Sequence, residues 1–85
     1  MKFEILFSEK WPKYWKVIPI EYQKNILNKM LLLKEERTFR HLKFGLTHFV
    51  LEIGQYRIIF SEQNSTRIML FVGNNKDYER WLGLR

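Results

Sequence analysis

Cationic side chains are the groups in this sequence best suited to act on a ligand. Fifteen lysines and arginines oppose nine acidic residues, which gives a net charge of +6. A balance of this sign favours an anionic partner, most often a nucleic acid, although the same charge could serve solubility alone. The planar guanidinium of an arginine forms two parallel hydrogen bonds to a phosphate. The cations considered for this role are Arg57, Lys43, Arg40 and Lys76.

Few other side chains could transfer a proton or hold a metal. The chain has no cysteine and two histidines, His41 and His48. This excludes a disulfide scaffold and a thiolate metal site, and it argues against structural zinc, so no metal or cofactor is expected. Glu52 and His48 are candidate bases on one predicted strand, and His41 is similar. A single glutamate or histidine on a strand is more often an ordinary surface residue, so both interpretations stay open.

Aromatic residues interleaved with lysines offer a different chemistry, the stacking of nucleic-acid bases. Trp11 and Trp15 lie one helical turn apart with Tyr14 alongside, whereas the neighbouring lysines fall on the other side of the same helix. Because the aromatic residues share one face, the spacing favours core packing over base stacking. Tyr78 and Trp81 have the same two interpretations, stacking on a base or packing of a helix onto a sheet.

The N-terminal half must supply one strand and two helices. Alternating apolar residues predict a strand over residues 2–7, and Ser8 is expected to cap a short helix that ends near Pro19. A second helix is predicted over residues 20–34, packed on the first as an antiparallel hairpin. The apolar face of this second helix comprises Tyr22, Ile26, Leu27, Met30, Leu31 and Leu33.

The C-terminal half changes to the period of two that is typical of strands. Strands are predicted over residues 47–53, 56–61 and 66–72, with a weak strand or extended loop over 39–44. The turns are expected at residues 54–55 and 63–65, and the last strand, the most apolar, is expected to be central. The prediction continues with a break at residues 73–75 and a closing helix over residues 76–84.

These elements predict a single α+β domain of residues 1–85, since 85 residues leave no room for a second core. The order is β-α-α-β-β-β-α, with a small antiparallel-rich sheet covered on one face by the helical hairpin and a short C-terminal helix. The other sheet face is expected to be partly open and to carry Arg57 with His48 and Glu52, because alternation places Arg57 opposite Tyr56 and Ile58. No stretch approaches the roughly 20 apolar residues that cross a membrane.

The same pattern resembles the RelE/ParE toxin superfamily over nearly the whole chain. Its elements are a Leu-Lys pair before a glycine turn, an "L-x-I-G" strand, a "YRIIF" strand and an apolar strand that ends in "FVG". In this sequence they are Leu42, Lys43 and Gly45, then residues 51–54, 56–60 and 71–73. The resemblance implies a small toxin of a type II toxin–antitoxin pair with the α+β fold given above.

RelE-like members of that superfamily enter the ribosomal A site and cut mRNA there, using the 2′-hydroxyl of the RNA as nucleophile and no metal. ParE-like members share the fold, inhibit DNA gyrase and cut nothing. The resemblance therefore implies a ribosome-dependent mRNA endonuclease. A ParE-like gyrase inhibitor and a degenerate toxin that retains only antitoxin binding are the alternatives. The implied partners are a cognate antitoxin, mRNA with the ribosomal A site, and operator DNA only through the antitoxin complex, in the cytoplasm and without a membrane.

The resemblance also implies roles for individual residues. Arg57 matches the strand arginine that contacts the scissile phosphate in ribonuclease members, and an ion pair with Glu52 across the hairpin is its alternative role. Lys43 matches the basic residue of the Leu-Lys element. The Arg or His that usually follows the last strand is replaced by Asn75, with Lys76 beside it. An asparagine transfers no proton at neutral pH, so this departure weakens the expected acid–base chemistry.

A second departure lies before the Leu-Lys element. Some ribonuclease members carry a glutamate there, where this chain has Arg40 and His41. The residues expected to contact RNA are Arg40, His41, His48, Asn75, Tyr78 and Trp81, and those expected to act in catalysis are Arg57, Lys43, Glu52 and Lys76.

Overall fold

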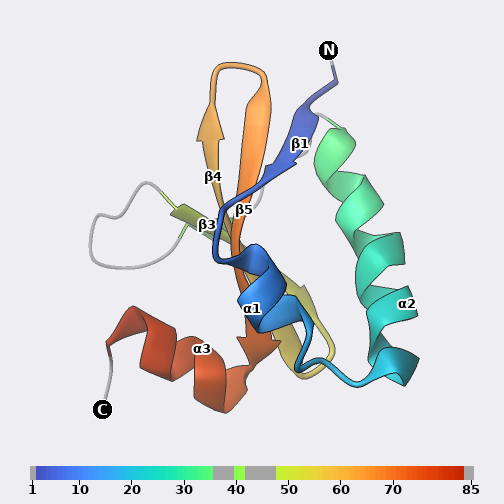
Figure 1. Ribbon diagram of the computed structural model, residues 1–85. Coiled ribbons are helices and arrows are strands. Elements are labelled where there is room, and N and C mark those ends of the chain that lie inside the picture. Colours follow the sequence, from blue (N-terminus) through green and yellow to red (C-terminus); the bar gives the residue numbers. More distant parts are fainter. Residues whose placement is uncertain (1, 36–39, 42–47, 84–85) are drawn as a thin grey trace.

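The computed structural model describes residues 2–35, 40–41 and 48–83, with Arg40 and His41 described by their backbone (Figure 1). It confirms the predicted α+β fold. Of the weak strand or loop predicted over residues 39–44, residues 40–41 form a strand, and the rest lies outside the described residues. The elements are β1 (Glu4–Phe7), α1 (Trp11–Trp15), α2 (Ile20–Met30), the 3-10 turn η1 (Leu31–Lys34), β2 (Arg40–His41), β3 (His48–Ile53), β4 (Tyr56–Gln63), β5 (Thr66–Asn74) and α3 (Asn75–Leu82).

The strands form one five-stranded sheet in the order β1-β5-β4-β3-β2. β1 runs parallel to β5, and the other neighbouring pairs are antiparallel. Two tight turns set this order, and each needs a residue with positive φ: Gly54 (φ 59°) between β3 and β4, and Asn64 (φ 57°) between β4 and β5. The middle strand is therefore β4, whereas β5, which was expected to be central, lies between β1 and β4.

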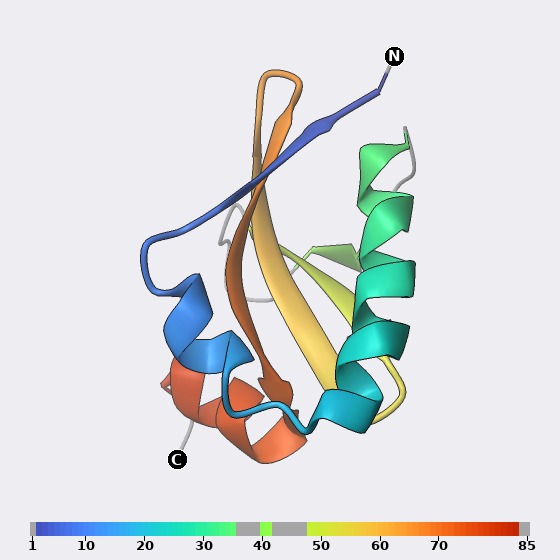
Figure 2. The ribbon, with the colours of Figure 1, turned by 45° about the vertical axis from the view of Figure 1, so that its right-hand side comes forward.

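The larger core lies on the sheet face that α2 covers, called the α2 face below (Figure 2). Side chains of both N-terminal helices pack there against alternate residues of β3, β4 and β5. This arrangement agrees with the predicted helical hairpin over one face. Its fully buried members, with no more than a trace of exposure, are Ile26, Leu33, Ile58, Phe60, Met69 and Val72.

A smaller core lies on the opposite face, called the α3 face, where α3 packs across the sheet. It is built around Val50, Ile59 and Phe71, with Tyr78 and Trp81 packed against them. The pairing of β4 with β5 is irregular between Ile59 and Phe60, since Ile59 pairs with Phe71 and Phe60 pairs with Met69. Because of this irregularity, two successive residues of β5, Leu70 and Phe71, both contribute to this core. On the face that was expected to be partly open, α3 thus covers the part built from Val50, Ile59 and Phe71.

Three local predictions are wrong. Ser8 is not a helix cap: its N–H bonds to Met69 O at 2.9 Å, which continues the β1–β5 pairing, and α1 begins only at Trp11. Leu27 and Leu31 do not widen the core face of α2 but are about half exposed, because the sheet lies under Ile26 and Met30. β5 continues through residues 73–74 instead of breaking there, and α3 begins at residue 75.

Candidate functional site

Arg57 lies on the α3 face at the end of the sheet where α3 begins. It occupies the second position of β4, directly opposite Glu52 on β3 and Gly73 on β5. Alternation along β4 explains the orientation, because Tyr56 and Ile58 point to the α2 face and belong to the larger core. The sequence prediction of which face carries Arg57 therefore agrees with the structure.

The guanidinium of Arg57 is held by three groups from two elements, β3 and α3. Its Nη2 lies 3.4 Å from Glu52 Oε2, and its Nη1 donates a hydrogen bond to Asn75 Oδ1. Its Cζ lies 5.2 Å from the centre of the Tyr78 ring, a cation–π contact. The Arg57 side chain is 20% exposed, so it is not fully buried. The group formed by Arg57, Glu52, Asn75 and Tyr78 is called the arginine cluster below.

Gly73 allows α3 to come this close to the sheet. A Cβ atom at this position would lie 2.6 Å from Phe71 Cζ and 3.0 Å from Asp77 Cβ. The Asn74 side chain then caps the helix by accepting the Asp77 N–H at 2.9 Å. Together these two residues turn the chain directly from β5 into α3, and this turn brings Asn75 and Tyr78 over Arg57.

His48, Tyr78 and Trp81 are placed by packing. The Trp81 ring lies 5.7 Å from the Phe71 ring and 6.0 Å from the His48 ring, measured between centroids. His48 Nδ1 is buried and has no hydrogen-bond partner among the described residues. Both aromatic residues of α3 thus take the packing role that the sequence left open, and their predicted contact with RNA stays a prediction.

The remaining predicted site residues are not brought together by the described part of the chain. Lys76 is exposed on the first turn of α3. Arg40 and His41 form β2, and the backbone register pairs them with Val50 and Phe49 of β3. Lys43 lies outside the described residues.

The sequence did not single out a groove between α1 and α3. Tyr14 of α1 and Trp81 of α3 both lie against Phe71, and side chains of both helices line an open cavity over β5. No local pattern could have indicated it, because its walls come from helices near opposite ends of the chain.

Within the described ranges, no group of three or more His, Asp or Glu side chains is placed to hold a metal ion. The helices seen in these ranges are also too short or too polar to cross a membrane. The arginine cluster instead places one half-exposed carboxylate, Glu52, against one cation, Arg57.

Comparison with solved structures places this geometry in a known fold. No protein-family model matches the chain, and no curated protein matches it by sequence. The archaeal RelE toxin in the RelB–RelE complex of Methanococcus jannaschii superimposes with a TM-score of 0.73 at 20% identity, over 89% of this chain and 96% of that one. The chain has the RelE fold. An arginine-to-alanine double mutant of E. coli toxin RelE in the free state gives a TM-score of 0.76 at 16% identity, over 96% and 93% of the two chains.

A third structure with the RelE fold is the RelBE2 toxin–antitoxin complex of Mycobacterium tuberculosis. It superimposes with a TM-score of 0.76 at 16% identity, over 88% of this chain and 93% of that chain. Both complexes contain an antitoxin beside the toxin. The fold predicted from the sequence resemblance is thereby confirmed, and at these identities the likeness concerns the fold.

Proposed function

We propose that this chain is the toxin of a type II toxin–antitoxin pair and that it cleaves translated mRNA on the ribosome. The observation that carries the proposal is the position of Arg57, a partly exposed guanidinium fixed by three neighbours on the α3 face of a RelE fold. A planar cation fixed in this way is preorganised for a phosphate whose negative charge grows in the transition state.

In the proposed reaction, the 2′-oxygen of the RNA attacks the adjacent phosphorus, and the bond to the 5′-oxygen of the next nucleotide breaks. The products are a 2′,3′-cyclic phosphate and a 5′-hydroxyl. Glu52, whose Oε2 lies 3.4 Å from Arg57, takes the proton of the 2′-hydroxyl, and water supplies a proton to the leaving oxygen. Arg57 donates to the non-bridging oxygens, and Lys76 and Lys43 add positive charge around the phosphate.

The neighbours of Arg57 also set a limit on the rate. Asn75 accepts a hydrogen bond from Arg57 and stands where the resemblance expects an Arg or His. Its amide cannot transfer a proton at neutral pH, and losing one proton-transfer group slows such reactions by about 10² to 10⁴. The ribosome can contribute positioning of the RNA. We therefore expect cleavage of translated messages and little cleavage of free RNA.

The second candidate function is that of a toxin that binds its antitoxin but cuts no RNA. It is favoured by the same contacts, because Glu52 and Asn75 already engage both Nη atoms of Arg57 in the free chain. Both candidates share two proposed partners, a cognate antitoxin and operator DNA bound through the antitoxin complex. Both also share a proposed cytoplasmic location. The mRNA in the ribosomal A site belongs to the first candidate alone.

The test is to produce the chain alone in a bacterial host and map 5′-hydroxyl RNA ends across translated messages. The proposal predicts new ends within translated regions that disappear in Arg57→Ala. Arg80→Ala is the matched control, since Arg80 is 70% exposed and pairs with Asp77, which is not a member of the arginine cluster. Growth arrest without new RNA ends would contradict the nuclease proposal and would favour inhibition of DNA gyrase. Soluble protein without growth arrest would favour the second candidate.

A further inference from the structure

A second open cavity lies between the first half of α2 and the turn that joins β3 to β4, called the α2 cavity below. Figure 2 shows this part of the helix beside the turn. The volume of the cavity is about 360 Å³, within the roughly 300–1,000 Å³ that is typical of small-ligand pockets. Its lining includes Tyr22, Asn25, Ile26, Ile53, Gln55 and Tyr56.

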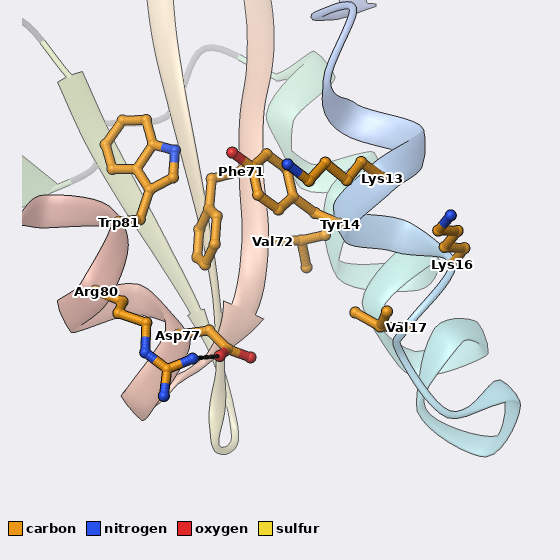
Figure 3. Close-up of a pocket in the computed structure, with 9 residues that line it drawn as sticks. All are labelled: Lys13, Tyr14, Lys16, Val17, Phe71, Val72, Asp77, Arg80 and Trp81. Atoms are coloured by element: carbon orange, nitrogen blue, oxygen red, sulfur yellow. Dashed lines mark ion pairs between the residues drawn. The ribbon is translucent and has the colours of Figure 1, made fainter.

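The charge of its lining sets the α2 cavity apart from the groove between α1 and α3. That groove is lined by three cationic side chains and one carboxylate, which Figure 3 shows. Among the described residues, none that lines the α2 cavity is charged, although the chain has a net charge of +6. A phosphate or a carboxylate would find no counter-charge in this lining, so the cavity favours an uncharged group.

The base of the α2 cavity is apolar and aromatic. Ile26, Ile53 and Tyr56 are buried there as members of the larger core. The Tyr22 ring lies 5.2 Å from the Tyr56 ring, measured between centroids. Tyr22 is 39% exposed, so, unlike Tyr56, it still offers ring surface to a ligand. An exposed aromatic ring beside an apolar base favours a flat aromatic ligand that can stack on it.

Two exposed side-chain amides complete the lining, Asn25 on α2 and Gln55 in the turn. Each amide carries both a hydrogen-bond donor and an acceptor. Adenine presents a donor at N6 beside an acceptor at N7, and the amide of Asn or Gln matches this pair with two hydrogen bonds. Guanine presents two acceptors that suit Arg or Lys, and cytosine presents a donor that suits a carboxylate. The described lining contains neither of these charged groups.

We infer that the α2 cavity binds an unpaired adenine base. The base stacks on Tyr22, and the amide of Asn25 or Gln55 pairs with its N6 and N7. Two sources share this chemistry, a free adenine nucleoside or nucleotide and an adenosine within single-stranded RNA. Tyr56 and Arg57 are successive residues of β4 that face opposite sides of the sheet, so the α2 cavity and the arginine cluster have no residue in common. The inference therefore does not rest on RNA cleavage.

The test titrates the isotope-labelled full chain with adenosine, which is uncharged and so gains nothing from the basic charge of the chain. We expect the side-chain amide resonances of Asn25 and Gln55 to shift and that of Asn28 to stay. Asn25→Ala/Gln55→Ala should weaken adenosine binding about tenfold. The matched control is Asn28→Ala/Gln63→Ala, which removes the same groups from exposed positions outside the α2 cavity and should stay within about twofold of the parent.

Two further probes test the base and its source. Inosine has an acceptor at position 6 where adenosine has the amino donor, and it should bind about fivefold more weakly or worse. A tetra-adenylate that binds more than about tenfold tighter than adenosine, and loses this affinity in Tyr22→Leu, assigns the base to single-stranded RNA. A smaller difference assigns it to a free nucleoside or nucleotide.

Three results would each overturn the inference. The first is that adenosine shifts neither side-chain amide resonance at about 10 mM. The second is that inosine binds as tightly as adenosine. The third is that Asn28→Ala/Gln63→Ala weakens adenosine binding as much as Asn25→Ala/Gln55→Ala does.

Discussion

Replacing Arg67 by methionine should strongly destabilise the fold. Arg67 is a charged residue with only 2% of its surface exposed, and it lies on the α2 face beside Met69. Its Nε and Nη2 bind Glu62 Oε2 at 3.1 and 3.0 Å. Its Nη1 donates to the carbonyl oxygens of Leu33 and Glu35, both at 3.0 Å, which ties the end of η1 to the sheet.

The magnitude follows from the groups that the substitution would leave behind. An unsatisfied buried carbonyl costs about 1–3 kcal/mol, and here the Leu33 oxygen would lose the donor described above. The Glu62 side chain is 28% exposed, so water would compensate part of its lost ion pair, and we assign about 1–2 kcal/mol to it. The cation–π contact with Phe3, at 3.9 Å, adds about 0.5–1 kcal/mol. The expected loss is about 3 kcal/mol or more, which lowers Tm by roughly 12–24 °C in a domain of this size.

The assay is urea unfolding followed by far-ultraviolet circular dichroism. Arg67→Lys should retain only part of the stability, because one ammonium cannot reproduce the fork that binds Glu62 and two carbonyls. Arg67→Met/Glu62→Leu should be more stable than Arg67→Met, since the second change removes the unpaired carboxylate. Arg80→Met is the control and should stay within about 0.5 kcal/mol of the parent. A loss below about 1 kcal/mol for Arg67→Met, similar to this control, would refute the reasoning.

Three further predictions concern α3 and the arginine cluster. Gly73→Ala should cost about 1–3 kcal/mol and loosen α3, because its Cβ would lie 2.6 Å from Phe71 Cζ, and hydrogen exchange of α3 amides would show the loosening. Gly54→Ala meets no atom within 4 Å and places its strain in the β3–β4 turn, where φ is 59°, so it should leave the α3 amides protected. Asn74→Ala should remove the cap on the Asp77 N–H and cost about 1 kcal/mol, measured by thermal unfolding, whereas an unchanged Tm would exclude the cap as a stabilising contact. Glu52→Gln should lower ribosome-dependent cleavage about 10²-fold or more while changing stability by less than about 1 kcal/mol, and cleavage within threefold of the parent would remove Glu52 from the proposed reaction.

The order of the elements could be predicted because each depends on local periodicity. The alternation of apolar and polar residues predicted β3, β4 and the start of β5. Gly54 and Asn64 adopt the positive φ that the two turns require. The same local signals misplaced the ends of some helices and strands. Ser8 has the side chain of a helix cap, yet its backbone is used by the sheet, and this pairing with Met69 cannot be read from neighbouring residues.

The coverage of the second sheet face could not be predicted for a related reason. Whether α3 packs on the sheet depends on the small residue at position 73 and on the shift in pairing between Ile59 and Phe60, and both act through neighbouring strands. The sequence therefore indicated the helix and its apolar residues but left open whether Tyr78 and Trp81 pack or bind. The groove beside α1 was missed because its walls come from opposite ends of the chain.

Two arginines on neighbouring strands show where sequence reasoning meets its limit. Arg57 and Arg67 both lie in apolar strands and both pair with a glutamate directly across a hairpin. Arg67 points to the α2 face, where two backbone carbonyls and Glu62 bind its donors and leave 2% of it exposed. Arg57 points to the α3 face and its side chain is 20% exposed, so it is open to the phosphate contact that we propose. Arg57→Ala should therefore change function more than stability, and Arg67→Met should do the reverse; if both variants unfold alike, burial does not separate the two roles.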